Sequence, residues 1–309
     1  MNEILCIDIG GSKFIAGAVT PEGKVLYTQK YVWQGHGAQN IVRQLFHGVD
    51  ELVSHFPQQD SHIPFGITIP GFADPDAGIW LSSSFLGIQA LPIAELFQKR
   101  YGRPVVLDND ANACALAEHR FGAGRDVLNF LYMTISNSIG GAFFLDGKLW
   151  QGSRRKAGEI GMLPTDDLAA KPPRRMNLED LASGRGLSRT YRRLCGEGTE
   201  ESLPADRLME LAVSGDKNAR KAFDIEGIYL ARAIAQAAFL TDPGLVILGG
   251  GVTLAYSMFE DTLHRELRRE MLHAPSMIPE VRATPLGYLG ALLGAASLAL
   301  GKMEEMAHE

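Results

Sequence analysis

The chain has 309 residues, of which 46% are hydrophobic, and a formal net charge of −6. This length allows two packed domains, and the acidic balance argues against a nucleic-acid-binding surface, which usually carries a basic stripe. Three isolated cysteines provide neither a disulfide framework nor a thiolate zinc site, and no signal peptide or membrane-spanning apolar run is present. We therefore expect a cytoplasmic protein that binds neither nucleic acid nor membrane.

The first half of the chain reads as an α/β domain. It opens with three strands, at residues 4–10, 14–20 and 25–33, separated by a Gly turn and a Pro-Glu-Gly-Lys hairpin turn. Apolar spacing and turn residues then predict a helix over 41–56, a strand over 64–71, a helix over 94–102, a strand over 104–110 and an Ala-rich helix over 111–122.

The second half begins with the same pattern as the first. Residues 129–150 read as strand, small-residue turn, strand, Asp-Gly-Lys hairpin and strand, about 125 residues after the first copy. Helical spacing follows over 203–240, then a buried strand that runs into a Gly-rich turn over 245–252, and a small-residue helix over 287–301. Such a repeat indicates two related domains.

A Gly turn follows a strand in each of the two domains. Facing turns of this kind would present backbone N–H groups to an anion such as a phosphate chain. For the Asp-Ile-Gly-Gly-Ser turn alone, a plain structural turn is an equally good reading. The duplication favours phosphate binding.

These motifs resemble the ROK sugar kinases, within the actin and hexokinase superfold. The resemblance runs over nearly the whole chain, and its specific parts are LDNDANACALAE and the pair GEIG with LEDLASG. It implies an α/β protein of two duplicated ribonuclease H-like lobes, as in actin-like ATPases, with a cleft between the lobes. We place the first lobe at 1–118, completed by the C-terminal helix at 289–309, and the second, with a helical insertion, at 119–288.

The resemblance implies roles for several residues of the sugar site. Asp110 matches the catalytic base, which accepts the proton of the sugar hydroxyl as the phosphoryl group moves. The alternative is helix capping, which Asp108 or Asp110 could perform before an Ala-rich helix. For Glu179, the alternative is a first-turn acid favoured by the helix dipole. The sugar ligands implied are Gly71, Ser84, Asn109, Glu159 and Glu179.

The resemblance also implies a site for ATP and its magnesium ion. Asp8 resembles the acid that orients the magnesium ion through water, and a hard cation suits such an oxygen ligand. The Gly-rich turn at 249–251 matches the segment that lies against adenosine, where a missing side chain lets a flat base approach the backbone. The nucleotide contacts implied are Gly10, Gly11, Ser12, Lys13, Ser136, Asn137, Ser138, Gly140, Gly249, Gly250 and Gly251.

The segment between the two glutamates departs from the family pattern. The family usually has a His after GEIG and a Cys-x-Cys-Gly cluster that together bind a structural zinc, whereas this chain has Met162 and the sequence DDLAAKPPRRMN. We therefore predict no zinc. Without a metal we expect residues 163–178 to be mobile when the site is empty. The features expected to position them are Pro164, Pro172 and Pro173, packing of Leu163, Leu168 and Met176, or the ligand.

Two further departures concern the phosphate turn and the sugar pocket. The family prefers Gly-Thr-Gly where this chain has Ser136, Asn137 and Ser138, whose side chains would crowd the approach to the terminal phosphate. Ser84 stands where the family tends to have Asn, which leaves room for a larger sugar.

The expected function is ATP-dependent phosphorylation of a hexose or hexose derivative, at its 6-hydroxyl, by a homodimer. The alternative is a catalytically weakened or non-catalytic sugar-binding regulatory protein. Only seven residues precede Asp8, so we expect no DNA-binding domain ahead of it.

Overall fold

The computed structural model describes residues 3–58, 60–168, 174–196 and 202–308. The contacts within the chain divide it into two compact units. Unit 1 comprises Met1–Arg125, Gly152–Lys156 and Leu289–Glu309, and unit 2 comprises Asp126–Gln151 and Ala157–Tyr288. Each unit contains one five-stranded sheet.

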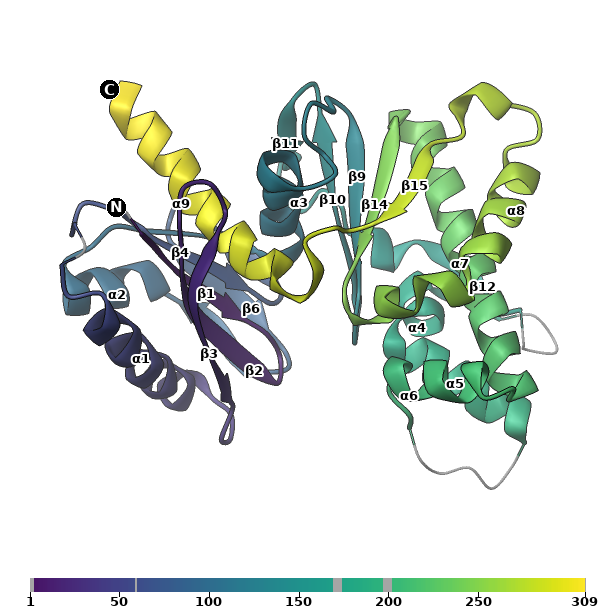
Figure 1. The fold of residues 1–309 in the computed structure, drawn as a ribbon, viewed down its shortest axis with the longest axis horizontal. Helices are drawn as coiled ribbons and strands as arrows, with labels where there is room; N and C mark the ends of the chain where they lie inside the picture. Colours follow the sequence, from purple (N-terminus) through teal and green to yellow (C-terminus); the bar gives the residue numbers. More distant parts are fainter. Residues whose placement is uncertain (1–2, 59, 169–173, 197–201, 309) are drawn as a thin grey trace. The chain divides into compact units, whose positions relative to one another are not determined.

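The sheet of unit 1 has the strand order β3-β2-β1-β4-β8 (Figure 1). β1 (Ile4–Ile9), β2 (Lys13–Val19) and β3 (Val25–Val32) form an antiparallel meander, whereas β4 (Phe65–Ile69) and β8 (Val105–Asn109) continue the sheet in parallel with β1. Every residue of β4 is buried, which is typical of a parallel strand covered on both faces. The edge strand β3 is largely exposed.

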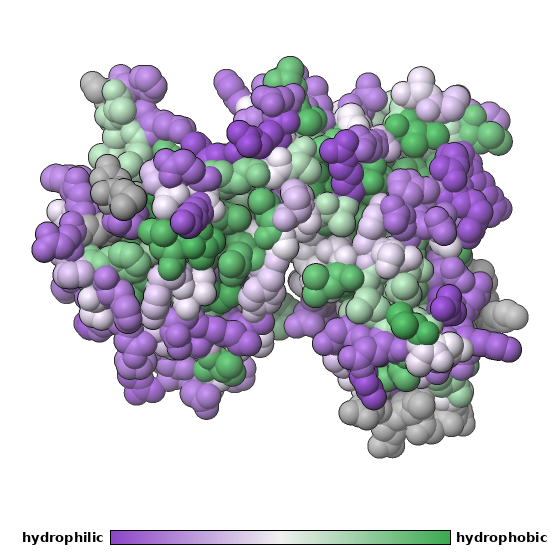
Figure 2. Space-filling view, in the orientation of Figure 1, coloured by the Kyte–Doolittle hydropathy of each residue, from purple (hydrophilic) through white to green (hydrophobic). Residues whose placement is uncertain are grey.

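The helices of unit 1 differ in how much of their surface is buried. In the described part of unit 1 the helices are α1 (Ala38–His55), α2 (Ile93–Tyr101), α3 (Asp110–Phe121) and α9 (Gly290–His308). In α1 the buried side chains of Ile41, Leu45, Val49 and Leu52 recur every three or four residues and form one apolar stripe. Hydrophilic residues gather on its outer face (Figure 2).

The C-terminal helix α9 belongs to unit 1, and its backbone lies in direct contact with the backbone of β4 and α3. A Cβ atom at Gly66 in β4 would lie 1.8 Å from the carbonyl oxygen of Ala295, and one at Gly294 would lie 2.7 Å from the backbone of Ala113 in α3. Small residues are therefore required on both sides of this contact. Unit 1 is therefore formed by residues from the N-terminal part of the chain together with the C-terminal helix α9.

Unit 1 also contains a small sheet that the sequence did not predict. β5 (Phe72–Asp74), β6 (Ile79–Ser83) and β7 (Ile88–Leu91) form three antiparallel strands. Trp80 in β6 is fully buried, and its indole N–H donates to the carbonyl oxygen of Pro70 at 3.0 Å.

The sheet of unit 2 repeats the topology of unit 1, in the order β11-β10-β9-β14-β15. Its strands are β9 (Phe130–Ile135), β10 (Ile139–Leu145), β11 (Lys148–Trp150), β14 (Leu245–Gly249) and β15 (Glu280–Ala283). β9 is antiparallel to β10 and parallel to β14, as β1 is to β2 and β4. The predicted duplicated α/β fold is confirmed.

The helices of unit 2 gather in its second half. They are α4 (Leu178–Ala182), α5 (Gly184–Cys195), α6 (Ala205–Val213), α7 (Lys217–Thr241) and α8 (Glu260–Glu270), with 3-10 helices η1 (Ile160–Met162), η2 (Gly251–Met258), η3 (Pro275–Met277) and η4 (Gly287–Leu289). The predicted helical stretch at 203–240 is two helices. Gly215 (φ 101°) breaks it, and the carboxylate of Asp216 then caps α7 by accepting from the amides of Asn218 and Ala219.

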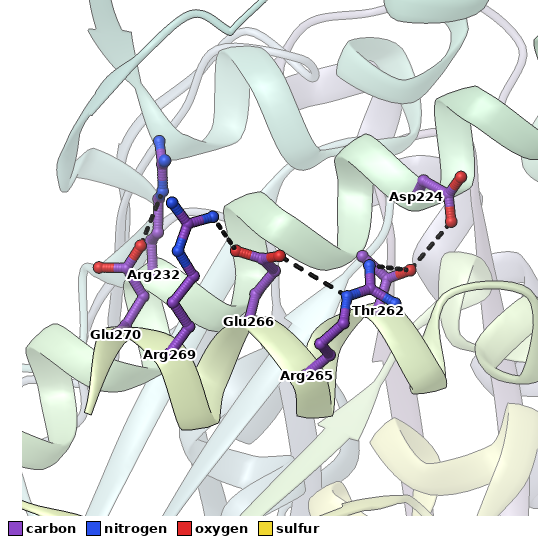
Figure 3. A network of polar contacts seen from close by, with 7 residues as sticks. All are labelled: Asp224, Arg232, Thr262, Arg265, Glu266, Arg269 and Glu270. Carbon is purple, nitrogen blue, oxygen red and sulfur yellow. Dashed lines mark hydrogen bonds and ion pairs between the residues drawn. The ribbon is translucent and has the colours of Figure 1, made fainter. Parts of the chain in front are cut away.

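Polar contacts join α7 to α8 and continue along α8 (Figure 3). Between the two helices, the Thr262 hydroxyl donates to Asp224 at 2.9 Å and the Arg232 guanidinium pairs with Glu270 at 3.2 Å. Within α8, the buried carboxylate of Glu266 is flanked by Arg265 and Arg269. None of the described helices is long and apolar enough to cross a membrane.

Candidate functional site

Several of the predicted site residues of unit 1 lie at the carboxyl edge of its five-stranded sheet. β1, β4 and β8 run parallel, and their register places Asp8 beside Thr68, Thr68 beside Asp108, and Ile69 beside Asn109. The turns that carry the site residues follow directly after these strands. In open α/β sheets this edge is where ligands bind.

Asp110 is the first residue of α3, and its carboxylate accepts from the amide of the next residue, Ala111, at 2.9 Å. The cap is Asn109, whose side-chain oxygen accepts from the amide of Asn112 at 2.7 Å. The buried carboxylate of Asp108 accepts from the amide of Asn109 at 2.7 Å and from the side chain of Asn112 at 3.1 Å. Asn109, and not Asp108 or Asp110 as in the alternative reading of the sequence, therefore takes the N-cap position, although the carboxylate of Asp110 also accepts from a helix amide. Asp110 is half-buried at the positive end of the helix, where a carboxylate is favoured.

Asp8 is partly enclosed at the end of β1. The hydroxyl of Thr68 donates to its carboxylate at 2.8 Å. Burial raises the pKa of Asp8, and the Thr68 hydrogen bond and the positive charge of Lys13 oppose that rise. Within the described ranges, no cluster of three His, Cys, Asp or Glu side chains could hold a metal ion. A lone carboxylate of this kind suits a magnesium ion that arrives with a nucleotide.

The Gly turn between β1 and β2 exposes backbone amides. The amide of Gly10 donates across the turn to the carbonyl oxygen of Lys13 at 2.9 Å. Gly11 and Ser12 are exposed, and their amides donate no hydrogen bond within the described part of the chain. Exposed amides of this kind can accommodate an anion.

Gly71 and Ser84 lie on turns around the small sheet of unit 1. Gly71 has φ 91°, and a Cβ atom there would lie 2.2 Å from the carbonyl oxygen of Ser82. The fold itself thus requires glycine at this position, whatever the ligand. Ser84 is exposed directly after β6.

In unit 2, two glycine contacts fix the backbone on either side of Glu159. A Cβ atom at Gly158 (φ 90°) would lie 2.3 Å from the carbonyl oxygen of Gly141, and one at Gly161 would lie 2.2 Å from that of Ile139. The segment therefore lies directly on β10. Glu159 is exposed between the two contacts.

Glu179 lies in the first turn of α4 and reaches the turn that joins β9 to β10. Its carboxylate accepts from the amide of Ile139 at 3.4 Å. The position also fits the alternative reading, because a carboxylate in a first helical turn is stabilised by the helix dipole. The two readings are compatible.

The turn at Ser136–Gly140 is fastened by the start of α5. The amide of Ser136 donates to the carbonyl oxygen of Ser138 at 2.9 Å within the turn. From α5, the amide of Gly184 donates to Ser136 at 2.7 Å and the guanidinium of Arg185 donates to the carbonyl oxygen of Asn137 at 2.8 Å. This turn and Glu179 therefore form one connected group.

The three glycines after β14 differ in what the fold demands of them. A Cβ atom at Gly249 would lie 2.2 Å from the hydroxyl of Tyr132, and one at Gly250 (φ 89°) would lie 2.4 Å from the carbonyl oxygen of Ile135. Packing on β9 accounts for both. Gly251 is exposed, and a Cβ atom there would meet open space. Of the three glycines, it alone lacks a structural explanation.

The segment between the two glutamates forms a short hairpin. β12 (Pro164–Asp166) pairs with β13 (Arg175–Asn177), and the amide of Leu178 donates to the carbonyl oxygen of Leu163 at 2.9 Å. Leu163 and Met176 pack against the core as expected, whereas Leu168 is 41% exposed. The expected contributions of Pro172 and Pro173 lie outside the described residues, and the absence of zinc stays a prediction.

Asp167 anchors this hairpin, a role that no sequence motif indicates. Its side chain is almost fully buried and pairs with the guanidinium of Arg193 in α5 at 2.6 Å. The hydroxyl of Tyr229 in α7 lies 3.4 Å from the same carboxylate and accepts from the amide of Leu168 at 2.9 Å. A buried carboxylate needs such partners, so the pair fixes the hairpin to two helices.

Comparison with known proteins gives consistent results. Residues 4–302 match the sequence profile of the ROK family. A glucokinase from Thermotoga maritima is 29% identical, with 96% of both chains covered, and a beta-glucoside kinase from Listeria monocytogenes is 26% identical over 85% of this chain and 87% of its own. The crystal structure of a ROK family glucokinase from Streptomyces griseus, in complex with glucose and AMPPNP, superimposes with a TM-score of 0.82 at 29% identity, covering 96% of this chain and 99% of that one.

Proposed function

Because this chain belongs to the ROK family, we propose that it is a sugar kinase that transfers the terminal phosphoryl group of ATP to a hydroxyl of a hexose or hexose derivative. The similar proteins named glucokinase and beta-glucoside kinase support this activity. The ligands of the S. griseus enzyme, glucose and an ATP analogue, support the pair of substrates.

Asp110 is the proposed general base. The single observation that carries this role is that Asn109 takes the N-cap position of α3, so that the half-buried Asp110 at the first helical position is not the capping residue. As the sugar oxygen attacks the γ-phosphorus, the bond from phosphorus to the bridging oxygen of ADP breaks and the hydroxyl proton passes to Asp110.

The proposed sugar ligands differ in what they offer. The side-chain oxygen of Asn109 is already engaged by Asn112, so its NH₂ group is the part that can donate to a sugar oxygen. The carboxylates of Glu159 and Glu179 accept from sugar hydroxyls, and a site built on such bonds rejects ligands that lack them. Gly71 and Ser84 complete the proposed pocket.

The proposed nucleotide contacts come from turns in both units. The amides at Gly10–Lys13 and the turn at Ser136–Gly140 face the phosphates, and Gly249–Gly251 lies against adenosine. Asp8 would hold the magnesium ion of ATP through water, and the ion would supply positive charge to the phosphates. We further propose that each chain consists of the two predicted lobes, that two chains form a homodimer in the cytoplasm, and that no zinc is bound. The hydroxyl that receives the phosphoryl group is the 6-hydroxyl in this proposal.

An ADP-release screen against aldoses, ketoses, amino sugars and glucosides tests this function. We expect at least one hexose to give sugar-dependent ADP release, and ³¹P and ¹³C NMR of the product to show a 6-phosphate. The Asp110→Asn variant is the matched control for contaminating kinases. Sugar binding without ADP release would contradict the proposal and favour the non-catalytic alternative.

A further inference from the structure

Trp33, at the end of β3, makes two hydrogen bonds to the Gly turn between β1 and β2. It directly follows β3, and its side chain is 9% exposed. Its indole Nε1–H donates to the carbonyl oxygen of Gly10 at 2.9 Å, and its backbone amide donates to the carbonyl oxygen of Ser12 at 3.3 Å. One residue therefore holds both ends of the exposed turn.

An aromatic stack fixes the direction of the indole. The rings of Trp33 and Phe14 lie 4.7 Å apart at an interplanar angle of 30°, and Phe14 stacks in turn on Tyr31 at 4.6 Å. Phe14 is fully buried, so this end of the stack cannot shift without disturbing the core. The indole N–H is thus aimed at Gly10 by packing.

The hydrogen bond to Gly10 determines where the next amide points. In a trans peptide unit, the carbonyl oxygen and the following N–H lie in the same plane and point in opposite directions. Holding the carbonyl of Gly10 toward Trp33 therefore directs the N–H of Gly11 away from it. Gly11 is exposed, and in the described part of the chain its amide meets no acceptor.

We propose that Trp33 is a positioning residue for nucleotide phosphates, because its indole sets the peptide plane that presents the amide of Gly11. This inference rests on the proposed function, in which the turn contacts ATP. The indole itself touches no substrate in this proposal and acts only through the backbone of the turn.

The Trp33→Phe variant tests the proposal, since it keeps an aromatic ring for the stack and removes the N–H donor. We expect the KM for ATP to rise roughly three- to tenfold, as the loss of one hydrogen bond predicts, with the KM for the sugar unchanged. Trp80→Phe loses the same kind of bond, to Pro70, and should leave the KM for ATP within about twofold of the wild-type value. Trp150→Phe is a second control, and because Trp150 is half-exposed on β11 we expect this variant to have unchanged kinetics.

A spectroscopic measurement gives an answer even if Trp33→Phe fails to fold. The chain has three tryptophans, so 5-fluorotryptophan labelling gives three ¹⁹F resonances. Trp80→Phe and Trp150→Phe assign two of them, and the third is Trp33. Addition of a non-hydrolysable ATP analogue with magnesium should shift the Trp33 resonance and leave that of Trp150 in place.

Two results would overturn the proposal: a KM for ATP unchanged in folded Trp33→Phe, or a Trp33 resonance that does not move at saturating nucleotide. If the wild-type protein phosphorylates no sugar, the proposed function fails on its own. The nucleotide titration then still decides the role of Trp33.

Discussion

The two units build the same hairpin and fasten its turn in different ways. In unit 1 the turn after β1 is held by an aromatic side chain from the neighbouring strand, through Trp33. In unit 2 the turn after β9 is held by helices, through Gly184 and Arg185 of α5 and Glu179 of α4. The strand pattern of the two units is shared, whereas the groups that orient each turn come from unrelated parts of the sequence.

This difference assigns different chemistry to the two turns. The turn of unit 1 is fixed without using the amide of Gly11, which stays available to an anion. The turn of unit 2 shares a hydrogen bond with Glu179, one of the proposed sugar ligands. We therefore expect changes around the first turn to act on ATP alone, and changes around the second to act on sugar as well.

The largest effect is expected from Asp110→Asn in unit 1. Removing the base should lower kcat by about two to four orders of magnitude, while sugar binding measured by calorimetry stays near the wild-type value. Because Asn109 supplies the cap of α3, the thermal midpoint should hardly change. Wild-type turnover in this variant would remove the base from position 110.

Gly250→Ala in unit 2 is expected to destabilise the fold. The alanine must adopt φ 89° with its Cβ atom 2.4 Å from a backbone oxygen, so the free energy of unfolding should fall by roughly 2–4 kcal/mol in urea titrations. Gly251→Ala is the matched control, because its Cβ atom meets open space and stability should stay within about 0.5 kcal/mol. A raised KM for ATP in Gly251→Ala would support the adenosine contact, and an unchanged one would contradict it.

Arg193→Gln tests the hairpin that carries the glutamates of unit 2. The change removes the guanidinium that pairs with the buried carboxylate of Asp167, and because Arg193 itself is half-exposed we expect the free energy of unfolding to fall by only about 1–2 kcal/mol. The KM for the sugar should rise more than the KM for ATP. The control is Arg207→Gln, which breaks an ion pair exposed on both sides and should change neither stability nor kinetics. Equal effects in the two variants would argue against the anchor.

The smallest effect concerns a buried acid in unit 2 and is visible only in the pH dependence of stability. Both carboxylate oxygens of Glu226 in α7 are buried without a hydrogen-bond partner in the described structure, and burial raises the pKa of Glu226 well above its usual value of 4.5. Its contribution to stability is therefore complete below that usual value and is lost as the pH rises through the raised pKa. Urea titrations from pH 4 to 9 should show this decline, and Glu226→Gln should flatten it. The same slope in both proteins would contradict the assignment.

Much of the fold could be predicted because its signals are local. The strands of the two meanders are apolar runs bounded by turn residues, and the pattern of 129–150 repeats that of the first thirty residues. The helix α1 follows from apolar residues at helical spacing. Local patterns of this kind do not depend on distant partners, which is why the duplicated α/β architecture was visible in the sequence.

Features that depend on distant partners could not be predicted. The burial of Asp167 requires Arg193 and Tyr229, which lie far along the chain, and a pair of adjacent aspartates gives no sign of it. The small sheet β5-β6-β7 depends on the packing of Trp80 rather than on a clear alternation. The cap of α3 could not be chosen either, because Asn and Asp cap helices about equally well.

The position of α9 has a consequence for synthesis on the ribosome. The faces of β4 and α3 that receive it, at Gly66 and Ala113, are made early, but the helix that covers them is made last. All described strands of unit 2 have been synthesised before α9 is made, whereas the surface of unit 1 that α9 covers stays exposed until then. Unit 1 can therefore finish folding only after unit 2 has been made, and until then its uncovered apolar surface is open to aggregation.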